Sequence, residues 1–134
     1  MRALVIGIND YPGHDADLAG CVNDANDIAA MLRARGCEPV MLLDRQATKQ
    51  AIVTEMISLV TSLTAEQVGF ISFSGHGTWV PDRDGDELDR RDEALVPADV
   101  VDESGLILDD QVDSILGLNR KSRLVLVTDS CHSG

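Results

Sequence analysis

Four short and almost uninterrupted apolar runs constrain the fold of this chain more than any other feature of its sequence. They cover residues 3–9, 39–43, 68–74 and 124–128, and they consist mainly of Val, Ile, Leu and Phe. Runs in which polar residues do not alternate with apolar ones are typical of parallel strands buried on both faces. The sequence therefore predicts an α/β fold whose parallel sheet is covered by helices on both sides.

Segments with helical periodicity lie between these runs. Apolar residues recur at helical spacing from Leu18 to Leu32, and Gly36 supplies a stop for that helix. Thr48 can cap a second helix, and Asp109 can cap a short third one. In a chain of 134 residues, of which 44% are apolar, this alternation predicts a single domain over residues 1–134. We expect a three-layer αβα sandwich with a mostly parallel central sheet.

The charge of the chain is strongly acidic and unevenly placed. Asp and Glu number 23 against 11 Lys and Arg, which gives a net charge of −12. This balance disfavours nucleic acids and anionic membranes as partners, because proteins bind both through Lys and Arg. Over half of the acidic residues lie between Asp82 and Asp113, a segment that is either a solvated loop or a site for a cation or a basic substrate. Its DRDGDE motif begins like an EF-hand loop, but Glu87 stands where that loop requires glycine.

The cysteines and the apolar runs also bear on location. Cys21, Cys37 and Cys131 form an odd set without paired spacing, so a disulfide framework is not expected. The first apolar run is too short for the hydrophobic region of a signal peptide. The sequence contains no apolar run near the ~18 residues that indicate a membrane span. We therefore predict a reducing, cytoplasmic location.

A histidine and a cysteine follow two of the predicted strands. His76 stands in SFSGHG after the third apolar run, and Cys131 stands in TDSCHSG after the last. Parallel neighbouring strands would bring both to the same edge of the sheet, where ligands of such folds bind. A thiol beside an imidazole can act as a nucleophile, and the amides of Gly77 and Cys131 could stabilise an oxyanion. The alternative is a structural histidine and a small apolar cysteine.

A second regularity favours the catalytic interpretation. Residues two positions apart in a strand share a face. Ser74 precedes His76 by two positions, and Asp129 precedes Cys131 by two. A carboxylate at Asp129 would select a basic side chain, because charge-assisted hydrogen bonds to Arg or Lys contribute about 1.5–3 kcal/mol each.

Six motifs together resemble a known family. ALVIGIN, GCVNDA, ISFSGHG, DGDE followed by DEALVPAD, LDDQ and TDSCHSG occur in the order found in metacaspases and bacterial orthocaspases, a branch of the caspase-like cysteine peptidases. The resemblance covers essentially the whole chain and matches the large, p20-type catalytic part. It implies a caspase-like fold and an endopeptidase that cuts after Arg or Lys, with Cys131 as nucleophile and His76 as general base and acid. It also implies that the basic side chain is held by Cys21, Asp24, Ser74 and Asp129.

The resemblance further implies calcium as an activator, although the chemistry itself requires no cofactor. The matching ligand positions are Asp92, Asp109 and Asp110, since calcium prefers several carboxylate oxygens. Alternatives remain open at both sites. Asp109 and Asp110 could be a helix cap and a first-turn acid, and some bacterial relatives do without calcium. Cys21 and Asp24 could equally form an ordinary helix N-terminal turn.

The resemblance also implies a partner. Relatives continue into a smaller p10-type segment that completes the sheet and the substrate cleft, whereas this sequence stops three residues after Cys131. We expect a p10-type subunit or the remainder of a parent chain, and peptide substrates with Arg or Lys. The chain would be a processing product, one half of a pair, or a fragment. There are two non-enzymatic alternatives. A receiver domain that accepts phosphate is disfavoured, because the third apolar run leads into SGHG. A pseudo-peptidase scaffold is disfavoured, because His76 and Cys131 are both present.

Overall fold

A six-stranded sheet forms the centre of the computed structural model, which describes residues 1–12, 18–81 and 91–132. Four of its strands are parallel, in the order β2 (Val40–Leu43), β1 (Arg2–Gly7), β3 (Val68–Pro81) and β6 (Arg123–His132). The short strands β4 (Arg91–Leu95) and β5 (Ile107–Leu108) continue the sheet in antiparallel fashion from the second half of β3. The prediction of a mostly parallel sheet is confirmed.

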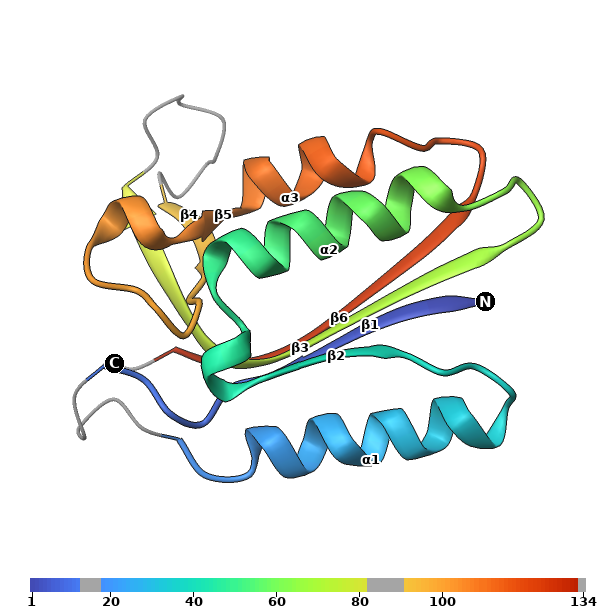
Figure 1. The fold of residues 1–134 in the computed structure, drawn as a ribbon. Helices are drawn as coiled ribbons and strands as arrows, with labels where there is room; N and C mark the ends of the chain where they lie inside the picture. The colour runs from blue at the N-terminus through green and yellow to red at the C-terminus, as the bar shows by residue number, and fades with distance from the viewer. Residues whose placement is uncertain (13–17, 82–90, 133–134) are drawn as a thin grey trace.

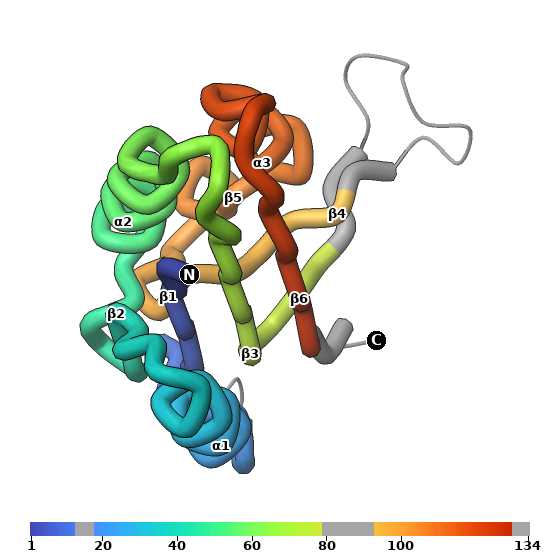
Figure 2. The backbone as a smooth tube through the Cα atoms, turned by 90° about the vertical axis from the view of Figure 1, so that its right-hand side faces the viewer, coloured from blue at the N-terminus to red at the C-terminus, as the bar shows by residue number. Residues whose placement is uncertain are grey.

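Helices cover the two faces of the sheet unequally. Helix α1 (Cys21–Ala34) lies on one face, and α2 (Lys49–Ser62) and α3 (Asp109–Leu116) lie on the other (Figures 1 and 2). Two 3₁₀ turns, Asp44–Gln46 and Glu103–Gly105, lie in the connections. The predicted three-layer αβα arrangement is confirmed. Within the described ranges, no helix is long and apolar enough to cross a membrane.

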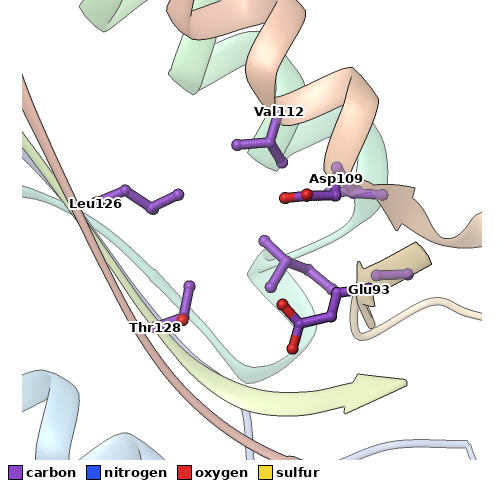
Figure 3. A pocket seen from close by; sticks show the side chains of 8 residues that line it. Glu93, Asp109, Val112, Leu126 and Thr128 are labelled. Atoms are coloured by element: carbon purple, nitrogen blue, oxygen red, sulfur yellow. The ribbon is translucent and has the colours of Figure 1, made fainter. Parts of the chain in front are cut away.

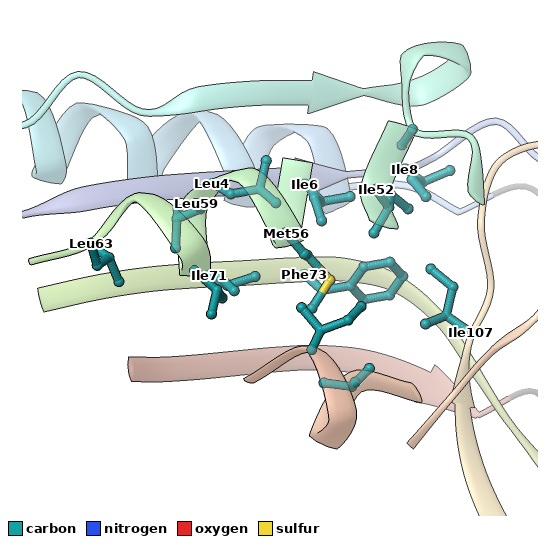
Figure 4. Close-up of a cluster of buried hydrophobic side chains, with 14 of the residues drawn as sticks. Leu4, Ile6, Ile8, Ile52, Met56, Leu59, Leu63, Ile71, Phe73 and Ile107 are labelled. Atoms are coloured by element: carbon teal, nitrogen blue, oxygen red, sulfur yellow. The ribbon is translucent and has the colours of Figure 1, made fainter. Parts of the chain in front are cut away.

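The core divides according to the alternation of side chains along β1. Leu4 and Ile6 face α2 and α3, where they join the larger cluster of buried side chains (Figure 4). Ala3 and Val5 face α1 and join a smaller cluster. The larger cluster also contains Ile8, Ile52, Met56, Leu59, Val60, Ile71, Phe73, Ile107, Val112 and Ile115. Because successive residues of a strand point to opposite faces, this division fixes the face of every strand residue near the site.

One helix start is as predicted and one is not. The Thr48 hydroxyl accepts a hydrogen bond from the amide of Ala51 at 3.1 Å, which confirms the cap of α2. The prediction that Asp109 caps α3 is wrong, because Asp109 is the first residue of that helix. The side chain of Gln111 instead reaches back and accepts a hydrogen bond from the amide of Leu108 at 2.9 Å. Asp109 is thereby left in the first turn, at the positive end of the helix dipole.

Strand β3 is longer than its apolar run. The sequence predicts a strand that ends at Ser74, whereas the observed strand continues to Pro81. It continues because β4 takes over as its neighbour once β1 has ended: Gly7 pairs with Ser74, and Leu95 pairs with Gly77. His76 therefore lies inside a strand and not beyond its end, which corrects the expectation.

Candidate active site

His76 and Cys131 are direct neighbours across two parallel strands. The register of β3 and β6 pairs His76 with Cys131, as the expectation of a shared sheet edge requires. His76 is partly buried. The structure describes the backbone of Cys131, and its side chain lies outside that description. Gly77, the predicted oxyanion donor, is a buried residue of β3 that pairs with Leu95 on one side and His132 on the other.

Two positions earlier, a row of three strand residues crosses the sheet. Gly7 on β1 pairs with Ser74 on β3, and Ser74 pairs with Asp129 on β6. Ser74 is 1% exposed, and its hydroxyl has no hydrogen-bond partner among the described residues. Asp129 is exposed. A buried hydroxyl therefore lies next to a solvated carboxylate, beside the pair of His76 and Cys131.

The first turn of α1 lies over Gly7, the β1 member of this row. A Cβ atom on Gly7 would lie 2.9 Å from the carbonyl oxygen of Cys21 and 2.6 Å from Cβ of Ala25. Only glycine at position 7 allows the helix to come this close to β1. Cys21 is buried and Asp24 is exposed in the same turn, which lies against Gly7, the strand neighbour of Ser74.

Asn9, which the sequence analysis does not single out as a site residue, fixes this turn in place. Its Oδ1 accepts hydrogen bonds from the amides of Cys21 at 2.9 Å and Val22 at 3.3 Å. Asp44 holds Asn9 in turn, since its Oδ1 accepts from the amides of Asn9 at 2.8 Å and Asp10 at 3.1 Å. A polar residue at the end of the first apolar run is the signal that could have indicated this role.

Tyr11 is a second residue that the sequence analysis does not single out, and it contacts His76 directly. Its ring lies against the imidazole with 4.6 Å between the centroids and a tilt of 52°. It is 4% exposed, and burial raises the pKa of its hydroxyl well above the usual value, so the hydroxyl stays protonated. Tyr11 and His76 both line a cavity of about 520 Å³, together with Val96, Val100 and Leu106.

The predicted calcium ligands are only partly brought together. Glu93 on β4 and Asp109 on α3 line a cavity of about 130 Å³, and their carboxylates project into the space that faces Leu126 and Thr128 (Figure 3). Glu93 was not among the predicted ligands. The side chain of Asp92 lies outside the description, and Asp110 is exposed.

The described residues alone do not complete a metal site. Among them, no three His, Cys, Asp or Glu side chains gather closely enough to hold a metal ion. The DRDGDE motif and the rest of residues 82–90 lie outside the described residues. The fit to calcium therefore rests on two carboxylates that share one cavity.

Comparison with known proteins gives consistent matches over the whole chain. The family model for the metacaspase peptidase C14 domain matches residues 1–134. Metacaspase-1A of Neurospora crassa is 39% identical over 99% of the chain, and Metacaspase-2 of Trypanosoma brucei brucei is 40% identical over all of it. A crystal structure of a protein from Geobacter sulfurreducens superimposes on 98% of the chain with a TM-score of 0.82 and 31% identity.

The matched proteins are longer than this chain. The match covers 32% of the Neurospora protein, 42% of the Trypanosoma protein and 50% of the crystallised Geobacter chain. The chain thus spans less than half the length of the curated relatives that it matches.

Proposed function

Since the chain belongs to the metacaspase family of C14 peptidases, we propose that it is the catalytic part of a cysteine endopeptidase that cuts peptide bonds after Arg or Lys. One observation carries the proposal: the register of β3 and β6 pairs His76 with Cys131 and, two positions earlier, Ser74 with Asp129. A base for a thiol and a carboxylate for a basic side chain thus occupy adjacent places in the sheet.

The first half of the reaction forms an acyl-enzyme. The imidazole of His76 takes the proton of the Cys131 thiol, and the thiolate attacks the carbonyl carbon of the scissile bond. The carbonyl oxygen becomes an oxyanion, to which we assign the amides of Gly77 and Cys131 as donors. The C–N bond then breaks, and the imidazolium gives its proton to the leaving amine. A thioester to Cys131 remains.

The second half of the reaction hydrolyses this thioester. His76 takes a proton from water as the water oxygen attacks the acyl carbon. The intermediate then expels the Cys131 thiolate, which regains its proton from the imidazolium, and the product carboxylic acid leaves. The cavity of about 520 Å³ beside His76 supports this route, because it offers room for the leaving segment and for the water.

We assign selection of the basic side chain to two carboxylates, one thiol and one hydroxyl. They are Cys21, Asp24, Ser74 and Asp129. The buried hydroxyl of Ser74 supports the assignment, because a ligand could satisfy it where the described protein residues do not. The exposed carboxylate of Asp129 beside it supplies the negative charge that a guanidinium or an ammonium requires.

We propose that a p10-type segment completes the sheet alongside β6. Among the described residues, β6 pairs with β3 alone, and Val125 and Val127 on its α1 side are 44% and 42% exposed. Sheets rarely leave such an edge strand open, because its free backbone groups pair with other chains. We also propose the cytoplasm as the location, which the free thiol of Cys37 supports.

We propose calcium as an activator that the chemistry itself does not need. Asp92, Asp109 and Asp110 would hold it, and Glu93 lines the same cavity as Asp109. When bound, calcium would neutralise these carboxylates and so hold the strand that carries Asp92 against the start of α3.

The proposed activity is tested with fluorogenic peptides that end in Arg, Lys or Asp before the reporter group. The full-length gene product should cut the Arg and Lys peptides and leave the Asp peptide intact. Cys131→Ala should abolish this cleavage, because it removes the nucleophile. Cys37→Ala is the matched control, since this buried thiol lies in the core on the α1 side. Parental turnover by Cys131→Ala would exclude the mechanism.

A further inference from the structure

The hydroxyl of Tyr11 replaces one backbone hydrogen bond of the sheet at His76. Strand β3 exchanges its neighbour β1 for β4 here, between the pairs Gly7–Ser74 and Gly77–Leu95. In a regular antiparallel ladder, the next residues along, 76 and 96, would exchange two direct hydrogen bonds. Only one of these two bonds is present: the amide of Val96 donates to the carbonyl oxygen of His76 at 3.0 Å.

The Tyr11 hydroxyl takes the place of the second bond, between the amide of His76 and the carbonyl oxygen of Val96. The amide of His76 donates to the Tyr11 hydroxyl oxygen at 2.8 Å, and the hydroxyl donates to the carbonyl oxygen of Val96 at 2.9 Å. The amide and carbonyl groups of His76 and Val96 that face each other here are thereby satisfied, with one hydroxyl group between the His76 amide and the Val96 carbonyl oxygen. Because burial raises the pKa of Tyr11, its proton remains available for the bond to Val96 over the ordinary pH range.

Gly75 leaves the space that this hydroxyl occupies. A Cβ atom on Gly75 would lie 2.6 Å from the Tyr11 oxygen, so only glycine at position 75 leaves the hydroxyl its place. The tyrosine ring meanwhile packs against the imidazole of His76 at 4.6 Å between centroids. A single buried side chain thus contacts both the backbone and the ring of the proposed general base.

We propose that Tyr11 is a positioning residue, which sets the place and orientation of His76 relative to Cys131 through its hydroxyl bridge and its ring. The inference rests on the proposed function, because it names what holds the base of that reaction. Without the hydroxyl, there are two outcomes. Either the amide of His76 and the carbonyl oxygen of Val96 move together to form a direct hydrogen bond, or each of these two groups loses its partner. Both outcomes move His76, and a displacement near 1 Å lowers turnover by about 100-fold in other enzymes.

Tyr11→Phe is the variant that tests this role, because it keeps the ring and removes the bridge. In the full-length gene product, we expect kcat on an Arg reporter to fall by about 10- to 100-fold. KM should stay within about threefold, since the residues assigned to the basic side chain are unchanged. Ile71→Val is the matched control: it lies buried on the same strand and loses a methylene from the core. This control should lower the unfolding temperature while kcat stays at the parental value.

A second measurement does not depend on activity. Amide hydrogen exchange at His76 should be faster in Tyr11→Phe than in the wild type and in Ile71→Val, because that amide loses its acceptor. Gly75→Ala serves as a second variant if Tyr11→Phe does not fold, since the new methyl group would displace the hydroxyl. It should lower kcat in the same direction.

The outcomes separate this inference from the proposed function. Parental kcat in Tyr11→Phe, or unchanged exchange at His76, would overturn the positioning role even if the enzyme is active. An equal loss of kcat in Ile71→Val would overturn it too, because the effect would then follow stability alone. A wild type without peptidase activity, or a Cys131→Ala variant that keeps it, would overturn the proposed function and this inference with it.

Discussion

At the scale of single residues, Asn9 ties the first turn of α1 to the loop after β1. Its side-chain oxygen accepts from the amides of Cys21 and Val22, which carry the otherwise unpaired donors of a helix start. The residue that begins α1 has no capping side chain of its own, because the preceding residue is Gly20. Asn9 therefore supplies α1 with a side-chain acceptor for its first amides, as Thr48, the residue directly before α2, does for that helix.

Asn9→Ala should loosen this turn and thereby the candidate pocket for basic side chains. We expect a loss of about 1 kcal/mol in the free energy of unfolding, together with a KM for Arg reporters raised several-fold. Thr48→Ala is the matched control, since it removes the cap of α2 at the same approximate cost and leaves α1 intact. Denaturant titration and steady-state kinetics measure the two effects. An unchanged KM in Asn9→Ala would remove this turn from the substrate site.

Asp129→Asn tests the selection of the basic side chain. The substitution keeps the size of the side chain and removes its charge, so a bound guanidinium loses a charge-assisted hydrogen bond of about 1.5–3 kcal/mol. We expect kcat/KM on Arg and Lys peptides to fall by about 10- to 150-fold, with no gain on Asp peptides. Glu66 is an exposed carboxylate just before the opposite end of β3, and Glu66→Gln should change kcat/KM on neither the basic nor the Asp peptides. An unchanged Arg preference in Asp129→Asn would exclude this residue from the pocket.

At the scale of secondary-structure elements, apolar runs predicted the parallel strands well and the antiparallel ones poorly. Strands β1, β2 and β6 correspond to runs of Val, Ile and Leu, because each packs apolar side chains against the core: Leu4 and Ile6 of β1 are buried, and Leu42 of β2 and Leu126 of β6 are partly buried. Strand β4 has the sequence RDEAL, with only two apolar residues, and it is held by backbone pairing to β3 and β5. Hydrophobic patterns do not record backbone pairing, so neither β4 nor the extension of β3 could be predicted in this way.

The same limit applies to the candidate site. His76, Cys131, Ser74 and Asp129 could be found because each follows or ends an apolar run at a fixed spacing. The Tyr11 bridge could not, since the bond to Val96 joins residues 85 positions apart and no local pattern marks it. The start of α3 shows a related failure. Both Asp109 and Gln111 are plausible partners for a helix start, and only the structure distinguishes them.

The start of α3 is also the element at which calcium is expected to act. Calorimetry on the full-length gene product should record calcium binding that is lost in the double variant Asp109→Ala with Asp110→Ala. Asp113→Ala is the control, because this exposed carboxylate lies one turn further along the same helix. Binding that survives the double change would place the ion elsewhere, and no binding to the wild type would make this a calcium-independent enzyme.

At the scale of the whole molecule, the open side of β6 is the surface most exposed to unwanted contacts. Val125 and Val127 lie there beside the edge of β6 that pairs with no other described strand, and exposed edges with apolar side chains promote association. Residues 1–134 expressed alone should therefore self-associate with rising concentration in sedimentation velocity. The double variant Val125→Lys with Val127→Lys should stay monomeric, whereas Val101→Lys, at an 88% exposed valine outside the sheet, should not. Equal association of all three chains would place the contact elsewhere.

The pairing of His76 with Cys131 inside one sheet has a consequence for control of the proposed activity. Neighbouring strands are held about 4.8 Å apart by their hydrogen bonds, so the backbones that carry the two residues cannot be separated without breaking the sheet. Moving the backbone of the nucleophile away from that of the base would require breaking the pairing of β3 and β6 at this point. If the proposed activity is regulated, we therefore expect the control to act on access of the peptide to the site, with the two strand backbones left paired.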